Sequence, residues 1–193
     1  MRPAFANEPV ANALVIATLL VWVIGELRQA LQRRSNAASS DRNSLLVLRV
    51  AIGIGVLLAL LGLRVSATAF GFNPLGVGVG LLLMWAGIGL RWWSFWTLGQ
   101  YFTFAVMTSR EQPVITAGPY RLLRHPSYAG ILLTLTGLGL LFGNWLSVAA
   151  LLVCALIGFA YRIRVEEAAL SKTLGDAYLT YAKTRKRLIP LIW

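Results

Sequence analysis

The stretch "PSYAGILLTLTGLGLLFGNWLSVAALLVCALIGFAY", residues 126–161, contains 36 residues without a single charge. A helix needs about 20 apolar residues to cross the hydrocarbon core of a bilayer. The stretch is therefore too long for one span, and Gly143 and Asn144 at its middle are typical turn residues. It predicts a tight hairpin of two membrane helices, at residues 126–142 and 145–162.

Further apolar runs lie upstream of this hairpin, and they predict spans at 10–32, 44–63 and 75–98. The whole chain is 58% hydrophobic and only 13% charged, which lies outside the range of soluble domains. The fold class predicted is all-α: a polytopic membrane helix bundle of five transmembrane helices, forming a single integral-membrane domain over residues 1–193. The first helix is expected to be retained, because no small-residue cleavage pattern follows it.

The composition excludes several kinds of site. One cysteine, Cys154, and one histidine, His125, are too few for a disulfide framework or for a zinc site, so no metal is expected. The chain has no Walker-type phosphate loop and no dinucleotide-binding glycine motif between a strand and a helix. The glycines of "GVGVG", residues 76–80, instead predict close helix packing.

The net charge of +11 is better explained by membrane topology than by a nucleic-acid partner. With residues 33–43 in the cytoplasm, five spans also place residues 99–124 and the C-terminus there. Fourteen of the 18 Lys and Arg residues then fall in or beside cytoplasmic segments. The N-terminus is therefore expected outside. Arg91, in the last third of the third span, leaves two alternatives open: a buried partner or wet cavity, or snorkelling to the interface.

The sequence after residue 161 predicts an amphipathic cytoplasmic helix that closes the site. Its apolar positions recur about one helical turn apart, at Leu170, Leu174, Tyr178 and Tyr181. Extending this stripe backwards by fours reaches Glu166 and then Arg162, so the side that packs on the protein carries a carboxylate and a guanidinium. Glu167 points about 100° away from the stripe and is the weaker candidate.

The motif "GPYRLLRHPSY", residues 118–128, supplies the second group of candidate residues. His125 and Pro126 predict a helix start, and a helix N-terminus favours a carboxylate or a phosphate. Gly118 allows the backbone to approach a ligand closely. Because a helical hairpin returns its two ends to the same side, this motif and "RIRVEE", residues 162–167, are expected to be neighbours. They predict one pocket with tyrosine walls and an apolar floor that opens toward lipid.

The motif "GPYRLLRHPSYAG" followed by "RIRVEEAALSKTLGDAYLTYAKTRKRLIP" resembles the isoprenylcysteine carboxyl methyltransferases and the wider group that includes phospholipid N-methyltransferases. The resemblance covers residues 114–190 and places the catalytic half at 99–193. It implies S-adenosyl-L-methionine as the cofactor, with S-adenosyl-L-homocysteine as its product. The implied cofactor contacts are Val114, Ile115, Tyr120, His125, Pro126, Ser127, Tyr128 and Glu166. Arg162 matches the family's substrate-associated arginine, so Arg162 and Glu166 are the expected catalytic pair.

The resemblance implies methylation of the carboxylate of a lipid-tailed, prenylcysteine-like acceptor that enters from the bilayer. A carboxylate is ionised at pH 7 and needs a cation rather than a base, and Arg162 fits that need. An amine acceptor would instead have to lose a proton to Glu or His. The alternatives are a phospholipid or other lipid-amine N-methyltransferase, a sterol-reductase-like enzyme and a non-catalytic membrane scaffold. The acidic pair with "G-x-x-Y-x-x-Y" favours a methyltransferase.

Overall fold

The computed structural model describes residues 3–31, 43–70, 73–101 and 113–189. Within these ranges the chain forms helices and no strand, which confirms the all-α fold class. The α-helices are α1 (Pro9–Leu31), α2 (Asn43–Gly62), α3 (Pro74–Leu98), α4 (Pro126–Phe142), α5 (Trp145–Leu174) and α6 (Asp176–Thr184). Short 3-10 turns stand at Ala4–Asn7, Ser66–Thr68, Gly99–Tyr101 and Gly118–Arg121.

Four of these helices, α1, α2, α3 and α5, are long and apolar enough to cross a membrane. The fifth predicted span, α4, is a shorter apolar helix of 17 residues, or about 26 Å. The predicted hairpin between α4 and α5 is confirmed: Gly143 adopts a left-handed conformation with φ 68°, and the Asn144 side chain caps α5. Most of the predicted loop 33–43 lies outside the described residues.

The separate amphipathic helix predicted after residue 162 is wrong in its boundaries. α5 continues without a break for 30 residues, about 45 Å, and ends only at Leu174. No Gly or Pro interrupts residues 162–174, so nothing in the backbone ends the helix where the apolar run ends. The break comes at Gly175, whose φ is 56°, and α6 then carries Tyr178 and Tyr181.

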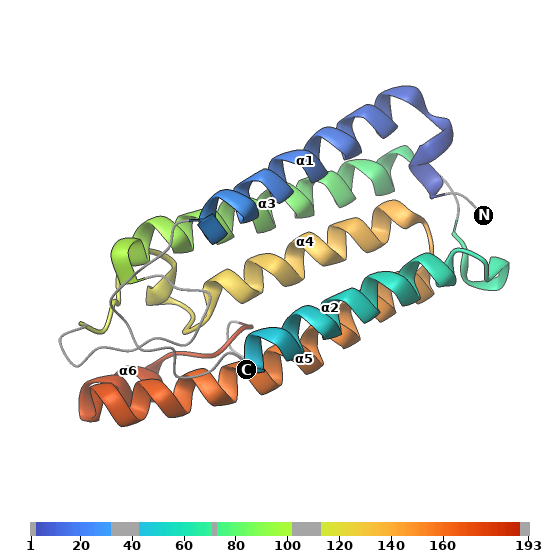
Figure 1. Cartoon of the computed structure of the whole chain (residues 1–193). Coiled ribbons are helices and arrows are strands. Elements are labelled where there is room, and N and C mark those ends of the chain that lie inside the picture. Colours follow the sequence, from blue (N-terminus) through green and yellow to red (C-terminus); the bar gives the residue numbers. More distant parts are fainter. Residues whose placement is uncertain (1–2, 32–42, 71–72, 102–112, 190–193) are drawn as a thin grey trace.

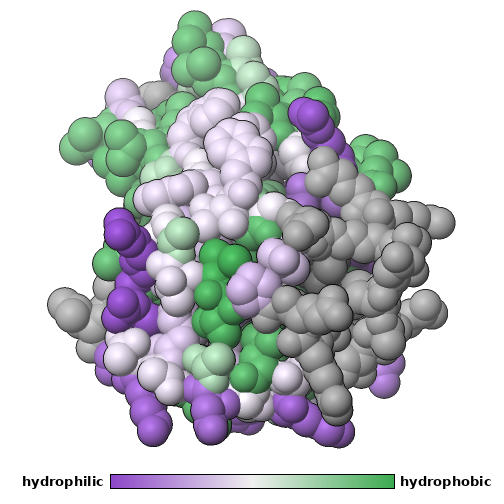
Figure 2. Space-filling model, turned by 90° about the vertical axis from the view of Figure 1, so that its left-hand side faces the viewer, coloured by the Kyte–Doolittle hydropathy of each residue, from purple (hydrophilic) through white to green (hydrophobic). Residues whose placement is uncertain are grey.

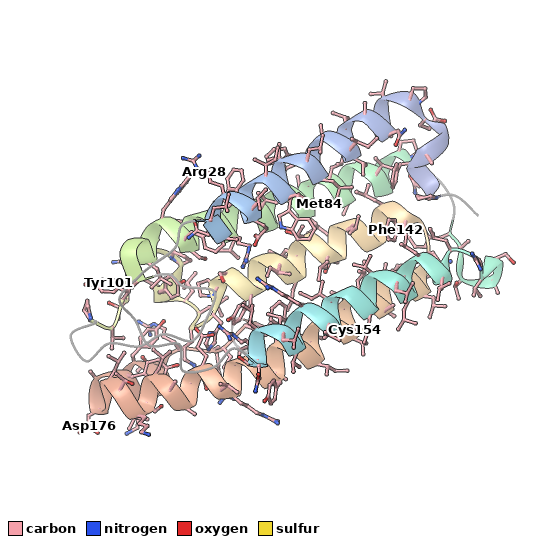
Figure 3. The ribbon with its side chains drawn as sticks, in the orientation of Figure 1. Arg28, Met84, Tyr101, Phe142, Cys154 and Asp176 are labelled. Atoms are coloured by element: carbon pink, nitrogen blue, oxygen red, sulfur yellow. The ribbon has the colours of Figure 1, made fainter. Side chains whose placement is uncertain are left out.

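The helices form two associated groups (Figure 1). α4 packs along α3, α2 packs along α5, and the hairpin joins the two groups through contacts between α4 and α5. α1 lies beside α3 and contacts the rest of the bundle less extensively. Figure 3 shows mainly carbon atoms along the outer sides of the bundle, and polar atoms gather at the end where α5 and α6 meet.

Glycines hold α3 and α4 unusually close together. A Cβ added to Gly87 would lie 2.4 Å from the carbonyl oxygen of Gly130, and one added to Gly137 would lie 2.3 Å from that of Gly80. Small residues allow such backbone approach between membrane helices. The predicted packing of "GVGVG" therefore holds for Gly80 alone. Gly78, about 200° round the helix from Gly80, has no neighbouring atom within 4 Å.

Candidate functional site

A cavity of about 510 Å³ opens at the polar end of the bundle, and helices from α1 to α6 contribute to its wall. Figure 2 looks onto this end, where a hydrophobic strip runs down the face and hydrophilic side chains gather around its lower rim. Eight of the nine residues predicted for the site line the cavity: Val114, Ile115, Tyr120, His125, Ser127, Tyr128, Arg162 and Glu166. The ninth, Pro126, is fully buried in the first turn of α4.

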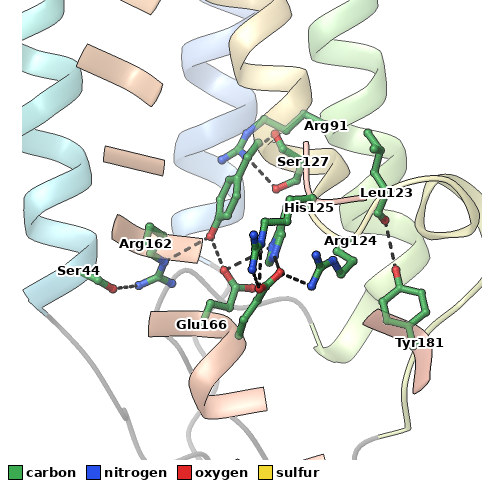
Figure 4. A network of polar contacts seen from close by, with 12 residues as sticks. Ser44, Arg91, Leu123, Arg124, His125, Ser127, Arg162, Glu166 and Tyr181 are labelled. Atoms are coloured by element: carbon green, nitrogen blue, oxygen red, sulfur yellow. Dashed lines mark hydrogen bonds and ion pairs between the residues drawn. The ribbon is translucent and has the colours of Figure 1, made fainter. Parts of the chain in front are cut away.

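Figure 4 shows the polar cluster that joins α4 to α5, and Tyr128 bonds to both Arg162 and Glu166 within it. Its hydroxyl donates to Glu166 Oε2 at 2.7 Å and accepts from Arg162 Nε at 3.3 Å. Arg162 is only 2% exposed, and its Nη1 also donates to the hydroxyl of Ser44 on α2 at 2.5 Å. The prediction that the two motifs meet at the open end of the hairpin is confirmed by these contacts.

Glu167 contacts three basic side chains and is half-buried. Its carboxylate lies 2.8 Å from Arg124 Nη1, 3.2 Å from His125 Nε2 and 2.9 Å from Arg187 Nη2. The side chain is 12% exposed, against 27% for Glu166. The stripe argument favoured Glu166 over Glu167, and Glu166 lines the cavity whereas Glu167 does not. Glu167 joins the start of α4 to the C-terminal segment.

That C-terminal segment, residues 185–189 and here called the strap, was not predicted. The backbone N–H of Arg124 donates to the Lys186 carbonyl at 2.7 Å, and that of His125 donates to the Arg187 carbonyl at 3.0 Å. Leu188 is 2% exposed and packs in the core. The strap therefore holds the backbone just before α4, where both His125 and the helix start are fixed.

Tyrosines from the turn and from α6 close the same end of the cavity. The Tyr181 hydroxyl donates to the carbonyl oxygens of Tyr120 at 2.9 Å and Leu123 at 3.2 Å. Burial raises the pKa of Tyr181 to about 12 and raises the pKa of Tyr120 well above its usual value. Both phenols therefore remain protonated at neutral pH, and Tyr181 acts as a hydrogen-bond donor that ties α6 to the turn.

Gly118 makes a close approach to α3. Its φ is 52°, which favours glycine, and a Cβ there would meet Thr97 Oγ1 at 2.6 Å and Trp93 Nε1 at 3.1 Å. The expected approach to a ligand stays a prediction. The glycine seats the 3-10 turn on α3 and so places Tyr120 against the cavity.

Arg91 has a buried partner and does not snorkel to the interface. The side chain is 4% exposed, and its guanidinium forms a two-point ion pair with Glu26 of α1, with Nη2 to Oε2 at 2.7 Å. Arg91 Nη1 also lies 3.3 Å from both the carbonyl oxygen and the hydroxyl of Ser127. Neither Glu26 nor Ser44 was predicted, although an acid inside the apolar span 10–32 is a signal for a functional position.

The sequence matches a known family over part of its length. Residues 79–172 match the isoprenylcysteine carboxyl methyltransferase (ICMT) family. The chain is 34% identical over 114 residues to protein-S-isoprenylcysteine O-methyltransferase A of Arabidopsis thaliana, covering 58% of each chain. It is 36% identical over 96 residues to the protein-S-isoprenylcysteine O-methyltransferase of Schizosaccharomyces pombe, covering 49% of this chain and 41% of that one. The chain thus spans about three fifths or less of the length of these relatives.

A solved structure has a similar fold. The eukaryotic intramembrane Ras methyltransferase ICMT matches with a TM-score of 0.62 and 22% identity, over 78% of this chain and 62% of that one. This likeness, together with the apolar helices, confirms the polytopic membrane helix bundle.

Proposed function

We propose that the chain is an integral-membrane methyltransferase, because residues 79–172 match the isoprenylcysteine carboxyl methyltransferase family. The reaction transfers a methyl group from S-adenosyl-L-methionine to the carboxylate of a lipid-tailed, prenylcysteine-like acceptor. The observation that carries the proposal is the single cavity in which Arg162 and Glu166 meet the aromatic and apolar residues of the bundle. Such a site suits a charged cofactor and a lipid-tailed acceptor together.

The side chains present fit this methyl donor. S-adenosyl-L-methionine carries a sulfonium, an ammonium and a carboxylate, and when bound it supplies an already activated methyl group. The Glu166 carboxylate can form an ion pair with the sulfonium or the ammonium of the cofactor. The tyrosine rings that line the cavity can bind the same cations over their faces. The residues proposed to hold it are Val114, Ile115, Tyr120, His125, Pro126, Ser127, Tyr128 and Glu166. Pro126 contributes only through the backbone of the helix start, since its ring is buried.

Arg162 is proposed to hold the acceptor carboxylate. Hydroxyls of Ser44 and Tyr128 fix the orientation of its guanidinium, which has the fork geometry that matches a carboxylate. The acceptor is ionised at neutral pH, so the reaction requires no general base. The protein's task is then to align the two reactants and to keep water out, and burial of Arg162 serves both.

The remaining wall of the cavity suits a lipid tail. α1 and α2 contribute apolar side chains there, among them Trp22, Leu27, Leu48 and Ile52. These helices lie within the membrane-spanning part of the chain, so the tail reaches the site from the bilayer. The proposed topology places the N-terminus outside and the site on the cytoplasmic side, where the basic residues concentrate.

Cofactor binding is tested by titrating the purified protein in detergent with S-adenosyl-L-homocysteine in a calorimeter. Wild type is expected to bind, and Glu166→Gln is expected to lose about 100-fold in affinity, since a charged partner is removed from a partly buried site. Asp176→Asn is the matched control, because this acid is exposed at the start of α6. Absence of binding by wild type, or equal binding by Glu166→Gln, contradicts the proposal.

The acceptor is tested with methyl-labelled cofactor and two lipids, a farnesylated cysteine analogue and phosphatidylethanolamine. Base-labile label on the farnesylated analogue is the expected result, because a methyl ester hydrolyses in base. Base-stable label on phosphatidylethanolamine alone would instead identify an amine N-methyltransferase and refute the carboxyl assignment.

A further inference from the structure

Arg49 is a charged residue at the cavity that neither the family match nor the proposed reaction uses. It lies on α2, outside residues 79–172. It follows Asn43, the first residue of this apolar helix, by six residues, which is about 9 Å along the axis. Its side chain is exposed and lines the same cavity as Arg162. A charge within a membrane-spanning helix marks a candidate functional position.

The other arginines that line the cavity already have partners within the bundle. Arg91 and Arg124 each form an ion pair with a glutamate. Arg162 is buried and is held by neighbouring side chains. Among the residues that the structure describes, Arg49 has neither a hydrogen bond nor an ion pair. Its charge is therefore not taken up by another described side chain.

The face of α2 that carries Arg49 borders an opening of the cavity toward the bilayer. Residues of this face recur at one-turn spacing, and apart from Arg49 they are apolar: Leu45, Leu48 and Ile52. Exposed side chains of α1, Val23 and Leu27, line the same cavity. α1 packs mainly on α3, and α4 is visible between α1 and α2 (Figure 1). The cavity therefore opens sideways between α1 and α2, with Arg49 on one side of the opening.

Arg49 also lies close to the proposed site along α2. Ser44, whose hydroxyl bonds to Arg162 at 2.5 Å, precedes Arg49 by five residues, which is about 7.5 Å along the helix. Side chains of a helix lean toward its N-terminus, and Ser44 lies at the N-terminus of α2. The guanidinium of Arg49 is thereby brought toward the level of Ser44 and Arg162.

We infer that Arg49 is a second binding residue for the acceptor: its charge attracts the acceptor carboxylate to the opening between α1 and α2 and keeps it beside Arg162. This inference rests on the proposed function. The acceptor comes from the bilayer with an ionised carboxylate, which a guanidinium attracts. Methylation removes that charge. Arg49 therefore favours binding of the acid over binding of the ester, and the ester leaves without this attraction.

The test compares Arg49→Met with wild type in steady-state methylation of the farnesylated cysteine analogue, normalised to the amount of folded protein. The assay uses a maltoside detergent, which contains no phosphate, so that a lipid phosphate does not account for a difference. The acceptor KM is expected to rise about fivefold, the upper range for an exposed ion pair, with kcat unchanged. Arg28→Met is the matched control, because Arg28 is exposed near the same end of α1 and does not line the cavity.

Inhibition by the methyl ester of the same analogue separates a charge effect from a structural one. The inhibition constant of the ester should be the same in Arg49→Met and in wild type, because the ester has no carboxylate. Arg49→Lys keeps the positive charge and is expected to restore most of the acceptor affinity. Because Arg49 is exposed and bonds to no described residue, neither substitution removes a polar contact from the described part of the bundle.

An unchanged acceptor KM in Arg49→Met overturns the inference. An equal weakening of acid and ester binding also overturns it, because the charge of Arg49 would then have no part in the effect. Ester formation by wild type tests the proposed function separately. If wild type forms no ester, the proposed function fails and the inference falls with it.

Discussion

The two ends of the α4–α5 hairpin both contain buried polar groups, and they differ in the partners of those groups. At the turn, Asn144 is 1% exposed, and its amide donates to the carbonyl oxygens of Gly62 and Val65 at 3.0 and 3.2 Å. Its own oxygen accepts from the backbone N–H groups of Leu146 and Ser147. These partners are main-chain groups at the end of α2, in the turn after it and at the start of α5. Asn144 therefore fixes the backbone where the two helices meet.

At the open end, Tyr128, Arg162 and Glu166 bind mainly one another and other side chains (Figure 4). Arg162 and Glu166 carry charge, and all three side chains line a cavity. Buried polar groups bonded to backbone stabilise a fold, whereas charged groups bonded side chain to side chain at a cavity are arranged for a ligand. The difference predicts that mutations at the turn reduce stability, and that mutations at the open end reduce binding and turnover.

Arg162→Met is expected to have the largest effect. Loss of the guanidinium that holds the acceptor should lower kcat/KM by about 1000-fold, because a charged hydrogen bond in a buried site is removed. The measurement is methyl transfer to the farnesylated analogue. Arg164→Met is the control on the exposed side of α5, and it should retain wild-type activity. If both variants lost activity equally, the arginine in the cavity would have no special role, and the comparison of the cavity with the exposed side of α5 would fail.

Asn144→Ala is expected to reduce the free energy of unfolding by about 3 kcal/mol, because it removes the cap of α5 and the two hydrogen bonds that this buried amide donates to Gly62 and Val65. Asn73→Ala removes the exposed cap of α3 and should cost about 1 kcal/mol. Equilibrium unfolding in mixed micelles measures both. Methylation per folded molecule should stay at the wild-type level in both, and a selective loss in Asn144→Ala would contradict the assignment of this centre to the fold.

Arg187→Ala tests whether the strap supports the open end. Removing its contacts with Glu167 should weaken S-adenosyl-L-homocysteine binding about tenfold, because the partner of His125 is released. Calorimetry measures the effect, and Lys183→Ala, an exposed basic residue of α6, is the control. An unchanged affinity in Arg187→Ala would limit the strap to a structural role.

Tyr181→Phe is expected to have the smallest effect: it removes the phenol that donates to the carbonyls of Tyr120 and Leu123, so it lowers Tm slightly below pH 10, and this difference from wild type shrinks as the pH rises toward 12. Because burial raises the pKa of Tyr181 to about 12, the folded chain keeps a proton that the unfolded chain releases above about pH 10. Stability from this group is present below pH 10 and is lost as pH rises toward 12. Thermal unfolding between pH 9 and 12 should therefore show a shallower loss of Tm in the variant. If Tm falls with pH equally steeply in the variant and in wild type, ionisation of Tyr181 does not contribute to the loss of stability at alkaline pH.

The parts of the molecule that the sequence predicted are those set by local signals. Uncharged length and the Gly143–Asn144 pair predicted the hairpin, and Pro126 predicted the start of α4. Hairpin geometry then placed Tyr128 near Glu166 without any knowledge of distances. The end of α5 was misplaced because hydrophobicity was used as the boundary, although only Gly175 breaks the helix.

The parts that were missed depend on pairs far apart in the chain. Glu26 meets Arg91 across 65 residues, and Ser44 meets Arg162 across 118. Helical periodicity gives the face of a residue on its own helix, but it does not give the neighbouring helix. The strap is a further case, because its contacts with Arg124 and His125 use backbone groups, which every residue carries.

The close glycine contacts between α3 and α4 make this helix pair more rigid than the packing of α1. Gly80 and Gly87 are seven residues apart, as are Gly130 and Gly137, so the two backbones touch at two levels separated by two helical turns. A slide of one residue would bring residues with a Cβ to positions where only glycine fits, so the two helices are fixed relative to each other. α1 has far fewer contacts with its neighbours. An incoming lipid would therefore displace α1 more easily than either helix of this closely packed pair.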